Sequence, residues 1–238
     1  MLPFPLVYHD GYDLHFGDHV FPSKKYRLIR HKLIDEFVAG PEDFMMPTAA
    51  TRDQLMLVHT PEWVRKLETG TLTYHEILKL EVPYSRKMVE GFFLAAGGTL
   101  LAAREALDKG VGFNIGGGFH HAFAGYGEGF CAINDMAVAI RVLQREGRIR
   151  TALVVDCDVH HGNGTAAIFA GDKSVFTLSI HHFNNYPTEK PPSTLDIHLP
   201  DGVGDQDYLN HLRPAYETAV AGFRPDLVVY VAGTDPFY

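Results

Sequence analysis

The sequence predicts an α/β domain built on a mainly parallel β-sheet flanked by helices. Three short apolar runs indicate this fold: Val111–Ile115, Thr151–Val155 and Leu227–Ala232. They do not alternate with polar residues, which is typical of strands that are buried on both faces, as in parallel sheets. Each run ends at a polar turn that contains His or Asp. Because ligands bind at the shared carboxyl edge of such sheets, we expect these turns to converge on one site.

The first half of the chain shows one expected strand and three expected helices. Leu6–Tyr8 is an apolar run, and apolar residues recur at helical spacing over Ser23–Val38. Thr60 followed by Pro61 marks a helix start, because threonine caps the free N–H groups and proline fits the first helical position. A long buried helix is expected over Arg86–Leu107, where two adjacent glycines would permit close packing.

The second half alternates helices with strands, as a parallel sheet with right-handed crossovers requires. The further elements are a helix over Ile133–Glu146, a strand over Asp172–Ile180, a proline-containing loop over Asn184–Leu199 and a helix over Asp205–Phe223.

Length and composition indicate one globular domain over residues 1–238. The 238 residues are 46% hydrophobic and 21% charged, enough to bury a core. The net charge of −8 argues against nucleic acid as a partner, since phosphates need a basic face, and mildly favours cationic substrates. Two cysteines do not make a disulfide framework, and no run has the length of a membrane span. We therefore expect a cytoplasmic protein without membrane partners.

Asp158, His160 and Asp235 are the candidate metal ligands. Residues i and i+2 of an extended segment point the same way, so Asp158 and His160 can face one ion, and Asp235 ends another strand. Three N/O ligands leave coordination positions open, which is the catalytic pattern. Zn²⁺ fits this set, and Fe²⁺, Co²⁺ or Mn²⁺ would accept the same ligands. The plainer alternative is that the aspartates cap helices and His160 is a surface residue.

The tandem His120-His121 follows three glycines, which let the backbone turn sharply and approach a ligand. An imidazole beside an activated water can act first as general base and then as general acid near neutral pH. Each ring needs an orienting acceptor, and Asp156 and Asn163 are the candidates. The alternative is a glycine loop with one histidine that is only buried.

Taken together, these motifs resemble the metal-dependent histone deacetylase family. The segments that carry the resemblance are His59–Trp63 (HTPEW), Gly116–Ala122 (GGGFHHA), Gly129–Asp135 (GFCAIND), Asp156–Gly164 (DCDVHHGNG) and Ala232–Pro236 (AGTDP). They stand in the family's order and cover nearly the whole chain. The Gly-Asn-Gly sequence and the short chain look most like bacterial relatives of the class IV branch.

The resemblance implies the arginase/deacetylase fold and hydrolysis of an acyl-amide, most often on lysine. Asp158, His160 and Asp235 match the zinc ligands, and His120 and His121 match the tandem active-site pair, with Asp156 and Asn163 at the partner positions. His121 is expected to be the general base, with His120 as electrostatic partner or proton donor.

The resemblance also implies secondary sites. Asp156, Asp158, His160 and Ser179 match a monovalent-cation site, which would take K⁺. Gly129 and Phe130 match one wall of a narrow acyl-lysine channel, with Tyr186 expected on the opposite wall. For both aromatic residues, plain core packing is the alternative.

Two departures from the family pattern qualify the expected activity. Asn163 stands where many relatives have Asp, so it offers a hydrogen bond without negative charge. The sequence also stops at Tyr238, before the family's Gly-rich segment with an oxyanion-binding Tyr, so the domain is expected to be incomplete at its C-terminal end. The first expectation is a deacetylase acting on acetyl-lysine in peptides or proteins. The alternatives are a deacylase of acetylpolyamines or other small amides, and a catalytically weak truncated fragment that binds metal and acyl-lysine.

Overall fold

The computed structural model describes residues 2–236, so Tyr238 lies outside the described residues. The chain forms two compact units, residues 1–143 and residues 144–238. Among the described helices, none is both long enough and apolar enough to cross a membrane.

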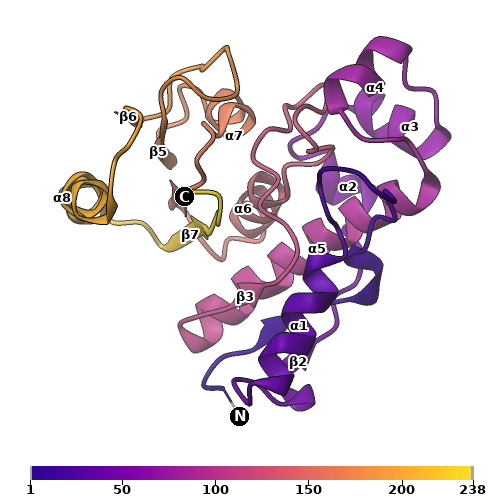
Figure 1. The fold of residues 1–238 in the computed structure, drawn as a ribbon, viewed down its shortest axis with the longest axis horizontal. Coiled ribbons are helices and arrows are strands. Elements are labelled where there is room, and N and C mark those ends of the chain that lie inside the picture. The colour runs from indigo at the N-terminus through magenta and orange to yellow at the C-terminus, as the bar shows by residue number, and fades with distance from the viewer. Residues whose placement is uncertain (1, 237–238) are drawn as a thin grey trace. The chain divides into compact units, whose positions relative to one another are not determined.

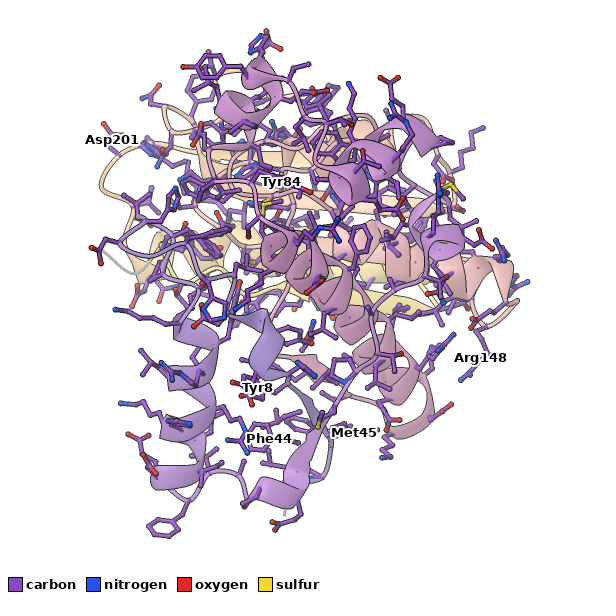
Figure 2. The ribbon with its side chains drawn as sticks, turned by 90° about the vertical axis from the view of Figure 1, so that its right-hand side faces the viewer. Tyr8, Phe44, Met45, Tyr84, Arg148 and Asp201 are labelled. Carbon is purple, nitrogen blue, oxygen red and sulfur yellow. The ribbon has the colours of Figure 1, made fainter. Side chains whose placement is uncertain are left out.

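The first unit contains a small parallel sheet in the order β2-β1-β3. Its strands are β1 (Leu6–Val7), β2 (Phe44–Met45) and β3 (Phe113–Asn114), which are each two residues long. Tyr8 follows β1, and its ring packs edge-on against Phe44 with the centroids 6.4 Å apart (Figure 2). The apolar runs Leu6–Tyr8 and Val111–Ile115 predicted β1 and β3, whereas β2 lies in none of the runs that the sequence singles out.

Helices are the main secondary-structure elements of the first unit (Figure 1). They are α1 (Lys25–Asp35), α2 (Arg52–Leu55), α3 (Pro61–Thr69), α4 (Tyr74–Leu80), α5 (Arg86–Lys109) and α6 (Asp135–Arg145), with 3₁₀ turns at Asp10–Tyr12 and Pro41–Asp43. The predicted start of α3 is confirmed, because the Thr60 side chain accepts a hydrogen bond from the Trp63 N–H at 3.2 Å. Close packing at the α5 glycines is also confirmed. A Cβ on Gly97 would lie 1.8 Å from the Thr48 carbonyl oxygen.

The second unit contains a four-stranded parallel sheet in the order β6-β5-β4-β7 (Figure 1). Its strands are β4 (Ala152–Asp156), β5 (Val175–His182), β6 (Leu195–Leu199) and β7 (Leu227–Val231), with the helices α7 (Asn163–Ile168) and α8 (Asp205–Phe223). All five residues of β4 are buried, as the unbroken apolar run predicts. Leu153, Val155, Leu178 and Ile180 form the core of this unit together with Ala219 of α8.

The predicted fold class is confirmed, with two differences in detail. The strands form two parallel sheets among the described residues instead of one. The predicted loop over Asn184–Leu199 is also wrong at its end, because Leu195–Leu199 pairs with β5 as β6. Leu195, Ile197 and Leu199 alternate with polar residues, and the prolines before them hid this strand signal.

Candidate metal centre and histidine pair

The glycine loop before the histidine pair is held by the buried carboxylate of Asp135. Asp135 Oδ1 accepts a hydrogen bond from the Phe119 N–H at 2.8 Å, and Oδ2 accepts one from the Gly118 N–H at 3.0 Å. The Thr99 hydroxyl donates to the same Oδ2 at 2.5 Å. Gly117 and Gly118 have φ angles of 120° and 80°, which side-chain-bearing residues rarely adopt. The loop conformation therefore depends on both the glycines and Asp135.

His120 and His121 are both buried, with exposed fractions of 4% and 5%. Their ring centroids lie 4.0 Å apart, with the planes tilted by 48°. Both rings make further interactions within the protein. The structure thus places two adjacent, buried imidazoles directly after the glycine loop.

A further buried histidine, His59, connects the residues before α3 to the segment around the pair. The Asn134 N–H donates to His59 Nε2 at 3.1 Å, so the proton lies on Nδ1, which donates to the Phe123 carbonyl at 3.1 Å. Burial lowers the pKa of His59 to about 4, although the backbone hydrogen bonds act in the opposite direction. His59 is therefore a neutral structural residue rather than a proton-transfer group.

Phe130 combines a half-buried ring with an unusual backbone. Its φ angle is 66°, and the preceding Gly129 has φ 50°. A left-handed conformation is costly for a bulky residue and is concentrated at ligand-binding sites. The Phe130 ring contacts the rings of His19, at 5.3 Å between centroids, and Phe21, at 5.8 Å. The ring contacts are those that core packing predicts, whereas the left-handed backbone favours a position at a ligand-binding site.

The second unit brings the three predicted metal ligands together. Asp158 and His160 follow β4, and Asp235 follows β7, the neighbour of β4 in the sheet. His160 Nδ1 lies 2.8 Å from Asp158 Oδ1 and 3.1 Å from Asp235 Oδ2. Ligand atoms of all three residues lie within 4.8 Å of one another. Parallel pairing of β4 with β7 is therefore what joins ligands so distant in sequence.

The electrostatics of this cluster are those of a cation site. Burial disfavours charge on His160, but hydrogen bonds to Asp158 and Asp235 outweigh it and raise the pKa of the imidazole to about 9. Gly233 leaves room beside the cluster, since a Cβ there would lie 2.5 Å from Asp158 Oδ2. Two carboxylates and one imidazole around a small space fit a divalent ion of the zinc type, with coordination positions left for water and substrate.

Asp156, Ser179 and Asn163 lie around the same end of the sheet. Asp156 Oδ1 accepts a hydrogen bond from the Asp158 N–H at 3.1 Å, and Asp156 is in register with Ser179 of β5. All three side chains are buried, and the Asn163 amide oxygen accepts from the Gly164 N–H at 3.0 Å. The residues predicted to bind a monovalent cation thus lie at or just after the carboxyl end of β4, with Ser179 paired to Asp156 from β5.

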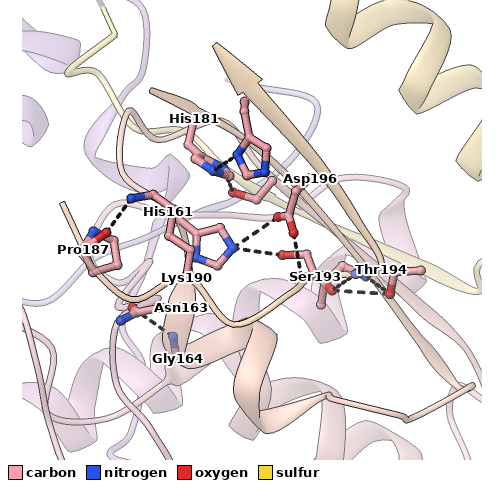
Figure 3. Close-up of polar contacts among 12 residues, drawn as sticks. His161, Asn163, Gly164, His181, Pro187, Lys190, Ser193, Thr194 and Asp196 are labelled. Carbon is pink, nitrogen blue, oxygen red and sulfur yellow. Dashed lines mark hydrogen bonds and ion pairs between the residues drawn. The ribbon is translucent and has the colours of Figure 1, made fainter. Parts of the chain in front are cut away.

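Tyr186 lies beside the cluster of Asp158, His160 and Asp235, on the loop between β5 and β6. Its ring centroid is 6.0 Å from that of His160, at an angle of 76°. The loop is held from within by Lys190, whose ammonium donates to the carbonyl oxygens of Asn185, at 2.8 Å, and of Pro187. Figure 3 shows the Lys190 side chain reaching toward Pro187. The sequence carries no signal for this role of Lys190, because its partners are backbone atoms.

The predicted site residues divide between the two units. His120, His121, Gly129 and Phe130 belong to the first unit, and the metal ligands, Asp156, Asn163, Ser179 and Tyr186 belong to the second. A second group of metal-ligating side chains, formed by His161, His181 and Asp196, was not predicted from the sequence. Two of these three were visible at the ends of apolar runs, but Asp196 lay in the segment that was predicted as a loop.

Residues 19–238 match the family model described as the histone deacetylase domain. An uncharacterized protein of Picosynechococcus is 43% identical over 98% of this chain and 78% of its own length. Histone deacetylase 2 of Arabidopsis thaliana is 30% identical over 97% of this chain, and a probable deacetylase of Archaeoglobus fulgidus is 31% identical over 97%. The chain spans 63% and 68% of the lengths of these two proteins.

Solved structures show the same relationship. The structure of a histone deacetylase homologue from Aquifex aeolicus matches 98% of this chain with a TM-score of 0.80 and 26% identity, and the chain covers 68% of it. The HD domain of HDA15 matches with the same TM-score of 0.80, at 27% identity over 97% of this chain and 74% of that one.

Proposed function

Because this chain belongs to the histone deacetylase family, we propose that it is a metal-dependent deacylase that hydrolyses acetyl-lysine in peptides or proteins. Members of this family are hydrolases that act on acylated substrates. The single observation that carries the proposal is the cluster of Asp158, His160 and Asp235, whose ligand atoms lie within 4.8 Å of one another.

These three residues would hold a divalent ion, with Zn²⁺ the best fit to the ligand set. When bound, such an ion polarises an acyl carbonyl and makes a water molecule more acidic. K⁺ would bind close to this ion, at the same end of the sheet, held by Asp156, Asp158, His160 and Ser179.

The histidine pair would move the protons. His121 accepts a proton from the attacking water, and the protonated pair supplies one to the leaving amine, with His120 as electrostatic partner or donor. Asp156 and Asn163 are proposed to orient the two rings. Burial of the imidazoles at 4% and 5% exposure supports this role, since it limits exchange with bulk water.

The proposed substrate channel has aromatic walls. Phe130, preceded by Gly129, would form one wall, and Tyr186, whose ring lies 6.0 Å from His160, the other. Two aromatic faces suit the apolar stem of an acylated lysine, which has lost its charge. The net charge of −8 further favours substrates whose remaining groups are cationic.

The test is hydrolysis of an acetyl-lysine peptide by metal-loaded wild type and by Asp158→Ala and His121→Ala variants. We expect wild type to release acetate, and both variants to lose more than about a hundredfold in kcat/KM. The exposed His211 of α8 provides a control, and His211→Asn should retain wild-type activity.

An acetylpolyamine in the same assay separates the two substrate classes. Preference for the polyamine over the peptide would replace acetyl-lysine with a small cationic amide as the substrate. Equal activity of wild type and Asp158→Ala would contradict the metal-dependent mechanism.

A further inference from the structure

A second cluster of metal-ligating side chains lies in the second unit, and the proposed chemistry does not use it. His161 comes from the turn after β4, His181 from β5 and Asp196 from β6. One ligand atom from each residue lies within 4.8 Å of the other two. Figure 3 shows the three side chains converging, with Ser193 beside them.

One pair of ligand atoms in this cluster has the spacing expected around a bound ion. Zinc–nitrogen and zinc–oxygen distances of about 2.0–2.2 Å place two tetrahedral ligands roughly 3.3 Å apart. His161 Nε2 lies 3.2 Å from Asp196 Oδ1. His198 Nδ1 lies 2.9 Å from His181 Nε2, so a further imidazole borders the cluster.

Hydrogen bonding alone leaves His161 unsatisfied. This residue is fully buried, and its Nδ1 has no hydrogen-bond partner. If the proton is on Nε2, which can donate to Asp196, the Nδ1 lone pair is buried without a donor. If the proton is on Nδ1, the Nε2 lone pair faces the carboxylate oxygen of Asp196. A cation bound between His161 Nε2 and the Asp196 carboxylate would remove the repulsion between this lone pair and the carboxylate oxygen.

His181 is suited to the same ion. Its side chain is 1% exposed, and its ring centroid lies 4.6 Å from that of His161. An imidazole binds a metal ion in its neutral form, through the lone pair of one ring nitrogen. Ser179 Oγ lies 2.9 Å from His181 Nδ1 and fixes the ring orientation.

We propose that His161, His181 and Asp196 form a second divalent-metal site, distinct from the cluster of Asp158, His160 and Asp235. Two imidazoles and one carboxylate are a set that binds zinc-type transition metals. The ion joins the turn after β4 to the neighbouring strands β5 and β6. It therefore fixes the base of the loop that carries Tyr186 and Lys190.

The experiment counts bound metal in the full chain. Protein stripped with a chelator is reloaded with Co²⁺, freed of excess by gel filtration, and analysed for metal content and visible absorption. We expect about two equivalents of Co²⁺ in wild type and about one in Asp196→Ala, since removal of one of three ligands abolishes tight binding. His181→Asn provides a second variant, and circular dichroism verifies that each is folded. His211→Asn, on the exposed surface of α8, controls for binding to surface histidines.

The outcomes separate the two clusters. Asp235→Ala should retain one equivalent, and the double variant Asp235→Ala/Asp196→Ala should retain none. Unchanged Co²⁺ content in both Asp196→Ala and His181→Asn, or an Asp235→Ala variant that binds no metal, would overturn the second site. If Asp235→Ala keeps the full wild-type content while Asp196→Ala loses its bound metal, the second site stands and the proposed catalytic site fails.

Discussion

Asp135 illustrates what can be predicted at the level of single residues. The candidate metal ligands and the histidine pair can be proposed from the sequence, because few functions need Asp, His and Asp at the ends of buried strands. Asp135 has no such signature, since two of its three bonded partners are backbone N–H groups of Gly118 and Phe119. A side chain that binds backbone N–H groups of a distant loop has partners that no sequence pattern identifies, so its role becomes visible only in the structure.

Replacing Asp135 with Asn should weaken the loop that carries the histidine pair. The amide can accept at only one of the two oxygen positions, which leaves a buried N–H unpaired at a cost of about 1–3 kcal/mol. We expect the free energy of unfolding in urea to fall by that amount. Asp226 also accepts two backbone N–H groups, of Arg150 and Thr151, but is exposed. Asp226→Asn should therefore change stability much less, and equal losses in the two variants would contradict this account.

His59 should make the stability of the protein depend on pH. Its pKa falls from 6.5 in the unfolded chain to about 4 in the fold. Between these values the unfolded chain binds a proton that the folded chain does not, so stability is complete above this window and decreases as the pH is lowered through it. The expected loss from His59 at about pH 5 is about 2 kcal/mol.

The measurement is urea unfolding of wild type and His59→Asn at about pH 7.5 and about pH 5. The asparagine does not titrate, so the variant should lose about 2 kcal/mol less than wild type between the two conditions. Identical pH dependence in the two proteins would show that His59 is not the titrating group.

At the level of elements, the long apolar strands were predictable and the short or interrupted ones were not. β4 is buried along its whole length, and its sequence has no polar residue before Asp156. β6 has exposed or half-buried positions, and Pro191 and Pro192 precede it closely. An edge strand of this kind alternates apolar and polar residues over only five positions, which a proline-rich neighbourhood obscures.

The loop between β5 and β6 depends on the ammonium group of Lys190. Lys190→Met retains an apolar side chain of similar length but cannot donate to the Asn185 and Pro187 carbonyls. If Tyr186 forms a wall of the channel, a loosened loop should raise KM for an acetyl-lysine peptide by about tenfold, the equivalent of one charged hydrogen bond. The value of kcat should change less, because the metal and histidine residues are untouched. Lys173, exposed before β5, supplies the control variant Lys173→Met, and equal KM values in the two variants would count against a role of Lys190.

At the level of the whole molecule, composition and the order of motifs were sufficient for the fold class and the family. The division of the strands into two sheets was not predictable. The strands β1, β2 and β3 are each two residues long, which is too short for a sequence pattern to indicate how they pair. Pairing of such short strands is decided by the helices packed around them, α5 above all, and not by a local pattern. The net charge of −8 is likewise a property of the whole chain.

That charge should favour cationic peptides at low salt. We expect kcat/KM for an acetyl-lysine peptide with flanking lysines to fall as ionic strength rises, because screening shortens the Debye length from about 10 Å at 0.1 M to about 3 Å at 1 M. A peptide of equal length with flanking glutamates should show the opposite trend or none. Parallel salt dependence for the two peptides would mean that long-range attraction does not contribute.

Pairing of β4 with β7 has a consequence for how the protein would acquire, during synthesis, the divalent ion proposed for Asp158, His160 and Asp235. Asp158 and His160 leave the ribosome well before Asp235, and 76 residues separate Val159 from the Asp235 carboxylate that it binds. At translation rates of about 5–20 residues per second, this interval lasts roughly 4–15 seconds. Throughout it, a nascent chain offers only one carboxylate and one imidazole of the three-ligand set. If these residues bind the proposed ion, loading would wait until β7 has been made and has joined the sheet. Metal binding would then be a late step that selects correctly paired chains.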